Sequence, residues 1–406
     1  METTTESSAT RSLNRDSAPA HISPYPRRRK RSPPRVLSRL LDPADVHFDG
    51  GRPWDIQVHD DALYGRVLRD GSLGLGEAYM DGAWDSEQLD ETFTRLLSLE
   101  LDVALHGIAR LRFASAWLGH RLINRQSRAR AFKVGEHHYD IGNDVYRAML
   151  DSQMNYSCGY WQHADDLEQA QQAKLDLICR KLGLAPGQRV LDIGCGWGAM
   201  SQYAAAYHGV EVVGITVSRE QAGLARERCE GLPVEILLLD YRELPERFGA
   251  EFDRIVSVGM FEHVGPKNYR AYFDVATRLL RDDGLFLLHT IGNSRTWPTT
   301  DAWIDKYIFP NGKIPSAQEI AAAIEPYLVF EDWHNFGLDY DRTLMAWWQN
   351  FDTAWPELRG RYDDRFYRMW KYYLHCCAGF FRSRQGQLWQ IVLGKRVGRV
   401  PYRSVR

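Results

Sequence analysis

The chain has 406 residues, of which 44% are hydrophobic, and its formal net charge is −2. This length accommodates two or three domains, and the near-neutral charge excludes both a polycation and an acidic solvating chain. None of the six cysteines forms a C-x-x-C pair, which argues against a zinc knuckle or a thiol redox motif.

The first segment, residues 1–38, is rich in Ser, Thr, Pro and Arg and contains the basic block RRRKRSPPR at 27–35. It lacks the apolar core of a secretory signal, so we expect a disordered tail on a cytoplasmic protein with reduced cysteines. The basic block is either solvated or attracted to an anionic surface. No stretch of about 18 apolar residues occurs, so no membrane span is predicted.

Residues 39–100 are predicted to form a small N-terminal domain, α/β or mostly helical. Its glycine-rich stretch GSLGLGEAYMDGAW, 71–84, follows no strand and lacks the Lys-Ser/Thr of a phosphate loop, which favours turns within a small α/β unit. Residues 101–135 interleave apolar residues with arginines. This pattern fits either a basic helix at a membrane interface or a helix packed on the next domain. Residues 136–406 are assigned to a catalytic domain.

From residue 183 onward, short apolar runs alternate with helical stretches. The runs RVLDIGC, VEVVGITVS, VEILLLD, FDRIVSVG and GLFLLHTI fit strands buried on both faces of a parallel sheet. LVFEDWHNF (328–336) and LWQIVLGK (388–395) are candidates for two further strands, with a helical region at 340–381 between them. The pattern predicts a doubly wound α/β fold.

Three glycines, Gly194, Gly196 and Gly198, directly follow the first strand of this sheet. They let the backbone turn sharply and approach a ligand, and the next helix offers its N-terminal amides. A dinucleotide fingerprint would add an acid about 20 residues later, but the second strand ends in GITVS. Asp192, just before the glycines, and Asp240, after the third strand, instead resemble the class I S-adenosylmethionine methyltransferases, in which the second acid contacts adenine.

Longer motifs narrow this resemblance. HHYDIGNDVYRAMLDSQMNYSCGYW precedes the sheet, GMFEHVGPKNYRAYF and LLHTIG follow, and WIDKYIFPNGKIPS and EDWHNFGLDYDRTLMAWW come later. Over residues 45–395 the chain resembles the cyclopropane-fatty-acyl-phospholipid synthases. The resemblance implies transfer of a methylene from S-adenosylmethionine to the cis double bond of an unsaturated acyl chain in a membrane phospholipid. A carbocation would lose a proton as the ring closes.

The resemblance also implies the residues of the site. Bicarbonate is the implied base, held by Cys158, Glu262, His289, Tyr340 and the backbone of Ile291. The implied donor contacts are Tyr156, Ser157, Asp192, Gly194, Cys195, Gly196, Thr216, Ser218, Gln221, Asp240, Tyr241 and Arg242. No metal is implied. Direct deprotonation by Glu262 or His289 is the alternative, and Cys158 is interpreted as an anion ligand and not as a nucleophile.

This chemistry places physical demands on the protein. An alkene is a poor nucleophile, so positioning must supply much of the rate, and a carbocation requires a dry pocket with aromatic faces nearby. The substrate lies in a bilayer, so we expect a peripheral protein on the inner face of the membrane. A homodimer is expected from the resemblance, and no nucleic-acid partner is expected.

Several alternatives stay open at this point. A related lipid C-methyltransferase would leave a methyl branch or a methylene group, a nicotinamide oxidoreductase would use the other nucleotide, and a lipid-binding protein would keep only the fold. His137 and His263 are weaker candidates for the site. Cys376 and Cys377 are interpreted either as lining of a lipid channel or as inert residues.

Overall fold

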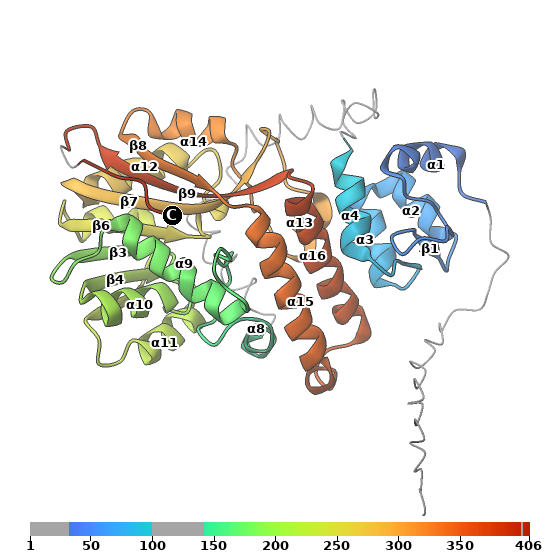
Figure 1. The fold of residues 1–406 in the computed structure, drawn as a ribbon, viewed down its shortest axis with the longest axis horizontal. Coiled ribbons are helices and arrows are strands. Elements are labelled where there is room, and N and C mark those ends of the chain that lie inside the picture. The colour runs from blue at the N-terminus through green and yellow to red at the C-terminus, as the bar shows by residue number, and fades with distance from the viewer. Residues whose placement is uncertain (1–31, 100–141, 399–400) are drawn as a thin grey trace, which may run out of the picture.

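A computed structural model describes residues 32–99, 142–398 and 401–406 (Figure 1). The described chain forms a small N-terminal unit and a larger α/β domain. The predicted tail up to residue 31, the predicted basic helix at 101–135 and His137 lie outside these ranges. Within them, no helix is both long and apolar enough to cross a bilayer.

The N-terminal unit is mostly helical, which is one of the two forms that we expected. Its elements are α1 (Arg35–Leu41), η1 (Asp42–Ala44), β1 (Gln57–Val58), α2 (Ala62–Asp70), α3 (Ser72–Met80), β2 (Trp84–Asp85) and α4 (Leu89–Ser98). The two short strands pair antiparallel. Helix α1 already begins at Arg35, so the folded chain starts before the boundary expected at residue 39.

The glycine-rich stretch at 71–84 contains helix α3, and the expectation that it only punctuates turns is wrong. Gly74 and Gly76 lie inside this helix because neighbouring groups approach its backbone closely. A Cβ on Gly74 would lie 2.2 Å from the carbonyl oxygen of Arg66, and one on Gly76 would lie 2.4 Å from Cδ1 of Trp303. These glycines therefore serve packing between elements, which their spacing along the chain does not reveal.

All seven predicted apolar runs form strands of one sheet, which confirms the doubly wound α/β fold. The strands are β3 (Arg189–Ile193), β4 (Glu211–Thr216), β5 (Val234–Leu238), β6 (Phe252–Val258), β7 (Leu280–Asn293), β8 (Leu328–Asn335) and β9 (Gly386–Lys395). Their order is β5-β4-β3-β6-β7-β9-β8. Strands β3 to β7 are parallel, whereas β9 runs antiparallel to both β7 and β8.

Helices cover both faces of the sheet. The helical elements of this domain are α8 (Asn143–Met149), α9 (Leu167–Leu182), α10 (Ala199–His208), α11 (Arg219–Arg228), η2 (Tyr241–Glu246), η3 (Phe261–His263), α12 (Tyr269–Leu279), α13 (Ala302–Tyr307), α14 (Ala317–Ile324), α15 (Leu338–Leu358) and α16 (Asp364–Arg382). Successive strand side chains point to opposite faces. Val190 packs with α9 and α10, whereas Leu191 packs with α12 and α14.

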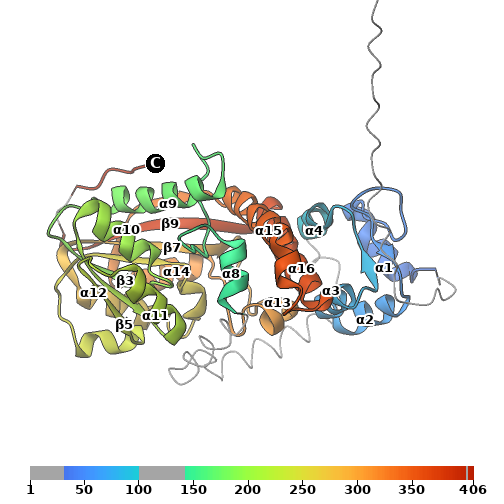
Figure 2. The same cartoon turned by 90° about the horizontal axis from the view of Figure 1, so that it is seen from below.

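Helices α15 and α16 stand between the sheet and the N-terminal unit in both views (Figures 1 and 2). The unit docks on α16 through α4: a Cβ on Gly379 would lie 2.6 Å from the Cβ of Phe93. Arg382 also donates to Asp90 at 2.7 Å. One hydrophobic core runs from the N-terminal unit through α15 and α16. The N-terminal unit is thus held beside the larger domain at the end where the site lies.

Candidate active site

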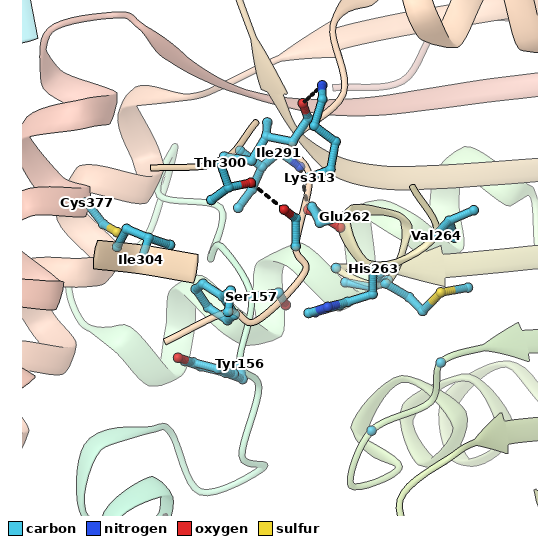
Figure 3. Close-up of a pocket in the computed structure, with 18 of the residues that line it drawn as sticks. Tyr156, Ser157, Glu262, His263, Val264, Ile291, Thr300, Ile304, Lys313 and Cys377 are labelled. Carbon is cyan, nitrogen blue, oxygen red and sulfur yellow. Dashed lines mark hydrogen bonds between the residues drawn. The ribbon is translucent and has the colours of Figure 1, made fainter. Parts of the chain in front are cut away.

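A cavity of about 690 Å³ lies between the strand ends and helices α4, α13, α15 and α16. Loops that follow β3, β4, β5 and β6 line one part of it, which we call the donor half. Apolar and aromatic side chains from the helices line the other part, the acceptor half. Figure 3 shows Tyr156, Ser157 and Glu262 around this space, with Ile304 and Cys377 on the helical side.

The glycine loop after β3 forms the floor of the donor half. Gly194 has φ +87°, and a Cβ there would lie 2.7 Å from Cγ of Met260. Gly198 has φ +88° and is the N-cap residue of α10, and a Cβ there would lie 3.0 Å from the Cβ of Ala225. At both positions the positive φ disfavours a side chain and the neighbouring atoms leave no room for one. The backbone of the loop therefore stays accessible to a ligand.

Asp192 is buried beneath this loop and lines the cavity. Its Oδ2 accepts a hydrogen bond from the hydroxyl of Ser201 at 2.7 Å. Burial raises the pKa of the Asp192 carboxyl to about 6, although the bond from Ser201 opposes this shift. The acid predicted from the first motif therefore reaches the donor half from below the glycines.

The cavity is lined by all of the predicted donor residues except Ser218. The Ser218 hydroxyl accepts from the backbone N–H of Gln221 at 3.3 Å and caps α11. The Thr216 hydroxyl in turn donates to the side chain of Gln221 at 2.9 Å. Ser218 thus positions Gln221. The cavity lining that follows β4 contains no acid, which disfavours a nicotinamide dinucleotide.

The acid after β5 is paired within the protein. Arg242 donates to both carboxylate oxygens of Asp240, with Nε at 2.7 Å from Oδ1 and Nη2 at 2.6 Å from Oδ2. The backbone N–H of Arg242 also bonds to Oδ1 at 3.0 Å. These contacts hold Asp240 at the strand end and leave Tyr241 beside it as a further lining side chain.

Glu262, in η3, supplies a buried carboxylate to the cavity. Its Oε1 accepts from the backbone N–H of Ile291 at 2.7 Å, the bond drawn in Figure 3. Its Oε2 is buried and has no hydrogen-bond partner among the described residues. Burial raises the pKa of Glu262 to about 7. This carboxyl group is therefore suited to hold or accept a proton near neutral pH.

The predicted anion ligands fall into two sets. Glu262, Ile291 and Tyr340 line the cavity, whereas Cys158 and His289 are buried without lining it. Burial raises the pKa of the Cys158 thiol, so it stays protonated. Burial also lowers the pKa of His289, whose Nε2 has no hydrogen-bond partner in the described part of the chain.

Aromatic rings dominate the acceptor half. The hydroxyls of Tyr156 and Tyr373 are 2.8 Å apart and join the segment before α9 to α16. The ring of Tyr340 stacks on Phe381, with centroids 4.5 Å apart. Other side chains that line this half are Leu96, Leu97, Leu99, Ile304, Phe309, Cys376, Cys377 and Phe380. The first three belong to the N-terminal unit or directly follow it, so this unit contributes to the wall.

Sequence reasoning missed Lys174, which is buried and lines the donor half. Its signal was present: Lys174 occupies the apolar face of α9 together with Ala170 and Ile178. His263, a weaker candidate, also lines the cavity, and burial lowers its pKa to about 4. The described residues contain no group of His, Cys, Asp and Glu side chains suited to a metal ion.

The sequence of this chain is similar to those of known proteins. The family described as mycolic acid cyclopropane synthetase matches residues 126–391. The cyclopropane-fatty-acyl-phospholipid synthase of Escherichia coli strain K12 is 55% identical over 365 residues, which cover 89% of this chain and 94% of that protein.

Solved structures of cyclopropane synthases match about two thirds of the chain. The cyclopropane synthase MmaA2 from Mycobacterium tuberculosis is 33% identical with a TM-score of 0.60, covering 65% of this chain and 98% of that one. The mycolic acid cyclopropane synthase CmaA1, complexed with SAH and CTAB, has a TM-score of 0.59 at the same identity and coverage. The chain therefore belongs to the cyclopropane synthase family that includes the cyclopropane-fatty-acyl-phospholipid synthases, and it has the class I S-adenosylmethionine methyltransferase fold.

Proposed function

We propose that this enzyme transfers a methylene from S-adenosylmethionine to the cis double bond of an unsaturated acyl chain in a membrane phospholipid and closes a cyclopropane ring. One observation carries the proposal: a single cavity joins a glycine-rich nucleotide loop to an aromatic, apolar chamber and contains Glu262, whose pKa is raised to about 7. The relatives of known activity support the same reaction class.

The donor half fits S-adenosylmethionine. The open backbone of Gly194 provides the floor, Thr216 and Gln221 stand where a ribose acid would lie, and Asp240 and Tyr241 form the adenine side. When bound, this donor supplies an electrophilic methyl group. The residues of this chain orient it toward the acceptor half and exclude water from the space between.

The acceptor half fits an acyl chain. Its lining gives a lipid tail apolar contact along its length, and burial of such surface contributes about 25 cal/mol per Å². The rings of Tyr340 and Phe381 offer aromatic faces to a neighbouring cation, worth about 1–2 kcal/mol when desolvated. The lining therefore both holds the alkene and protects a carbocation from water.

A proton acceptor completes the site, and bicarbonate is the proposed one. The residues fit a small anion that carries a proton, because Oε2 of Glu262 and Nε2 of His289 are both buried without partners among the described residues. Glu262, Tyr340 and Ile291 line the cavity and would contact it, whereas Cys158 and His289 are buried behind this lining and would shape the pocket around it. Since the Ile291 N–H donates to Glu262, that amide already fixes the carboxylate in place. Direct deprotonation by Glu262 is the alternative.

Contact with a bilayer and self-association belong to the same proposal. The enzyme would act as a peripheral protein on the cytoplasmic face of the membrane and as a homodimer. Because α1 begins at Arg35, deletion of residues 1–31 removes the basic tail without cutting a described element. Co-sedimentation with anionic vesicles should weaken on this deletion and with added salt. Unchanged sedimentation would remove the tail from the mechanism, and analytical ultracentrifugation would measure the dimer.

The reaction can be tested directly. The protein is incubated with unsaturated phospholipid vesicles and a labelled methyl donor, with and without bicarbonate, and the acyl chains are analysed by mass spectrometry. We expect label in a ring-containing chain and a lower rate without bicarbonate. A branched or methylene-bearing chain would instead support the related lipid C-methyltransferase, and no labelled lipid would contradict the proposal.

A further inference from the structure

Lys174 of α9 is a buried ammonium group, and no carboxylate of the described residues lies in direct ion-pair contact with it. Its exposed fraction is 1%. Nζ donates to Oδ1 of Asn155 at 2.9 Å and to the hydroxyl oxygen of Ser157 at 3.1 Å. Both acceptors are neutral, and no carboxylate of the described residues forms an ion pair with it. An ammonium group has three N–H donors, so these two acceptors leave it incompletely satisfied.

The position of Lys174 connects this charge to the cavity. Lys174, Asn155 and Ser157 line the donor half together with Asp192 and Gly194. Burial lowers the pKa of Lys174 to about 8, and the more distant carboxylates of Asp151 and Asp192 only partly oppose this shift. A buried cation is stabilised when an anion pairs with it. The donor half therefore offers a place for one negative charge.

A second buried lysine on the same helix, Lys181, does have a carboxylate partner within the protein. The side chain of Lys181 is also fully buried, with an exposed fraction of 0%, and its Nζ lies 3.8 Å from a carboxylate oxygen of Asp332. Nδ1 of His334 lies 3.0 Å from the same Nζ. Lys181 does not line the cavity. The two lysines share burial and helix, and they differ in the counter-ion and in access to the ligand space.

We propose that Lys174 pairs with the α-carboxylate of the bound methyl donor, an inference that rests on the proposed function. The Ser157 hydroxyl accepts from Lys174 and keeps its own proton, so both groups can donate to one carboxylate. Bicarbonate is the other anion that this cation could attract, because Lys174 also acts electrostatically on His289. The donor is favoured because the partners of Lys174 line the cavity, whereas His289 does not.

Calorimetry on the full chain tests this pairing with two ligands. One is S-adenosylhomocysteine, and the other is its decarboxylated analogue, which keeps the amine and lacks only the carboxylate. In Lys174→Met we expect the affinity for S-adenosylhomocysteine to fall roughly 10- to 100-fold, and the affinity for the analogue to stay unchanged. Lys181→Met is the matched control and should leave both affinities unchanged while it lowers the thermal stability.

A measurement on the unmodified protein covers the case in which Lys174→Met does not fold. An anion raises the pKa of a neighbouring ammonium group. Since the pKa of free Lys174 is about 8, binding of S-adenosylhomocysteine slightly above this pH should take up protons. Binding of the decarboxylated analogue should take up fewer. Calorimetry in buffers of different ionisation enthalpy measures this difference.

The outcomes separate the alternatives. Equal loss of both affinities in Lys174→Met would mean that Lys174 only positions the loop, and equal proton uptake with both ligands would also overturn the pairing. An unchanged affinity for S-adenosylhomocysteine with a raised bicarbonate requirement would assign Lys174 to bicarbonate and overturn the proposal. If the unmodified protein binds neither nucleoside, the proposed function itself fails, whatever the variants show.

Discussion

The two halves of the cavity are built in different ways. The donor half consists largely of short loops at the ends of neighbouring parallel strands, and its shape depends on backbone conformation at positions such as Gly194. The acceptor half is assembled from α4, α13 and the consecutive helices α15 and α16, which come from separate parts of the sequence. Local backbone geometry therefore decides the first half, and side-chain packing between distant elements decides the second.

Charge separates the halves as well. Asp192, Lys174 and the Asp240–Arg242 pair are all in the donor half. Glu262 lies where this polar lining meets the aromatic rings of the acceptor half. A charged cofactor and an apolar tail can thus share one cavity without either being forced into an unsuitable environment. Changes in each half should consequently have separable effects.

The largest effect is expected at the junction. Glu262→Gln removes the carboxylate that holds or accepts a proton, and product formation should fall by about 10²- to 10⁴-fold. Affinity for S-adenosylhomocysteine should not change, because the donor half is left intact. Mass spectrometry of the acyl chains and calorimetry measure the two quantities. Equal losses of both would place Glu262 in donor binding and remove the distinction between the halves.

The pH dependence of stability should report the same carboxyl group. The pKa of Glu262 rises from an ordinary value of 4.5 to about 7 on folding. Below pH 4.5 the carboxyl group is neutral in both the folded and the unfolded chain, so its burial costs no charge desolvation. As the pH rises to about 7 the unfolded chain loses this proton and the folded protein keeps it, which lowers the stability of the folded protein. The unfolding free energy of the wild type, relative to Glu262→Gln, should fall by about 1.4 kcal/mol per pH unit in that window. Above about pH 7 this difference in unfolding free energy should be constant.

Urea unfolding of the two proteins across this range measures the difference, and the comparison cancels other titrating groups such as Asp192. Under the alternative in which Glu262 itself takes the proton, the activity should change in the opposite direction and rise through about pH 7, because the neutral acid cannot accept a proton. A pH-independent stability difference would show that burial does not perturb Glu262 in this way.

The glycine loop gives a test confined to the donor half. Gly194→Ala places a Cβ 2.7 Å from Met260 at a φ of +87°, so both strain and overlap should cost about 2–4 kcal/mol of stability. Gly187→Ala is the matched control, with φ +80° but no atom within 4 Å of the added Cβ. It should lose only about 1 kcal/mol. Thermal unfolding measures both variants, and only Gly194→Ala should weaken nucleoside binding.

Helix α3 gives the corresponding test near the acceptor half. Gly76→Ala places a Cβ 2.4 Å from Trp303 of α13, and the overlap should cost about 1–3 kcal/mol and lower activity on phospholipid vesicles. In Gly65→Ala, within α2, the added Cβ has no neighbour within 4 Å and should stabilise the protein by about 0.5–1 kcal/mol. Nucleoside affinity should be unchanged in both. A loss of nucleoside affinity in Gly76→Ala would mean that the two halves of the cavity are coupled.

Several features of the fold and the site were predictable because their causes are local. Each strand of the sheet is a short apolar run with neighbours on both faces, and the nucleotide loop is a glycine cluster directly after such a run. Helix α3 was missed because glycine occurs both in turns and where two elements pack tightly, and the sequence around Gly74 and Gly76 does not distinguish these two settings. Only the approach of Arg66 and Trp303 distinguishes the two cases.

The amino-acid sequence by itself determined the parallel core of the sheet and the glycine cluster after its first strand, because burial and backbone conformation act over a few residues. The methyl donor followed from longer motifs that resemble those of a known family. The tertiary structure decided which candidate side chains reach the cavity: Ser218 caps a helix, and Cys158 and His289 are buried away from the lining. It also decided that, among the described residues, Lys181 has a carboxylate in ion-pair contact and Lys174 has only neutral hydrogen-bond acceptors. Such pairing depends on segments that meet only after folding, so no local pattern records it.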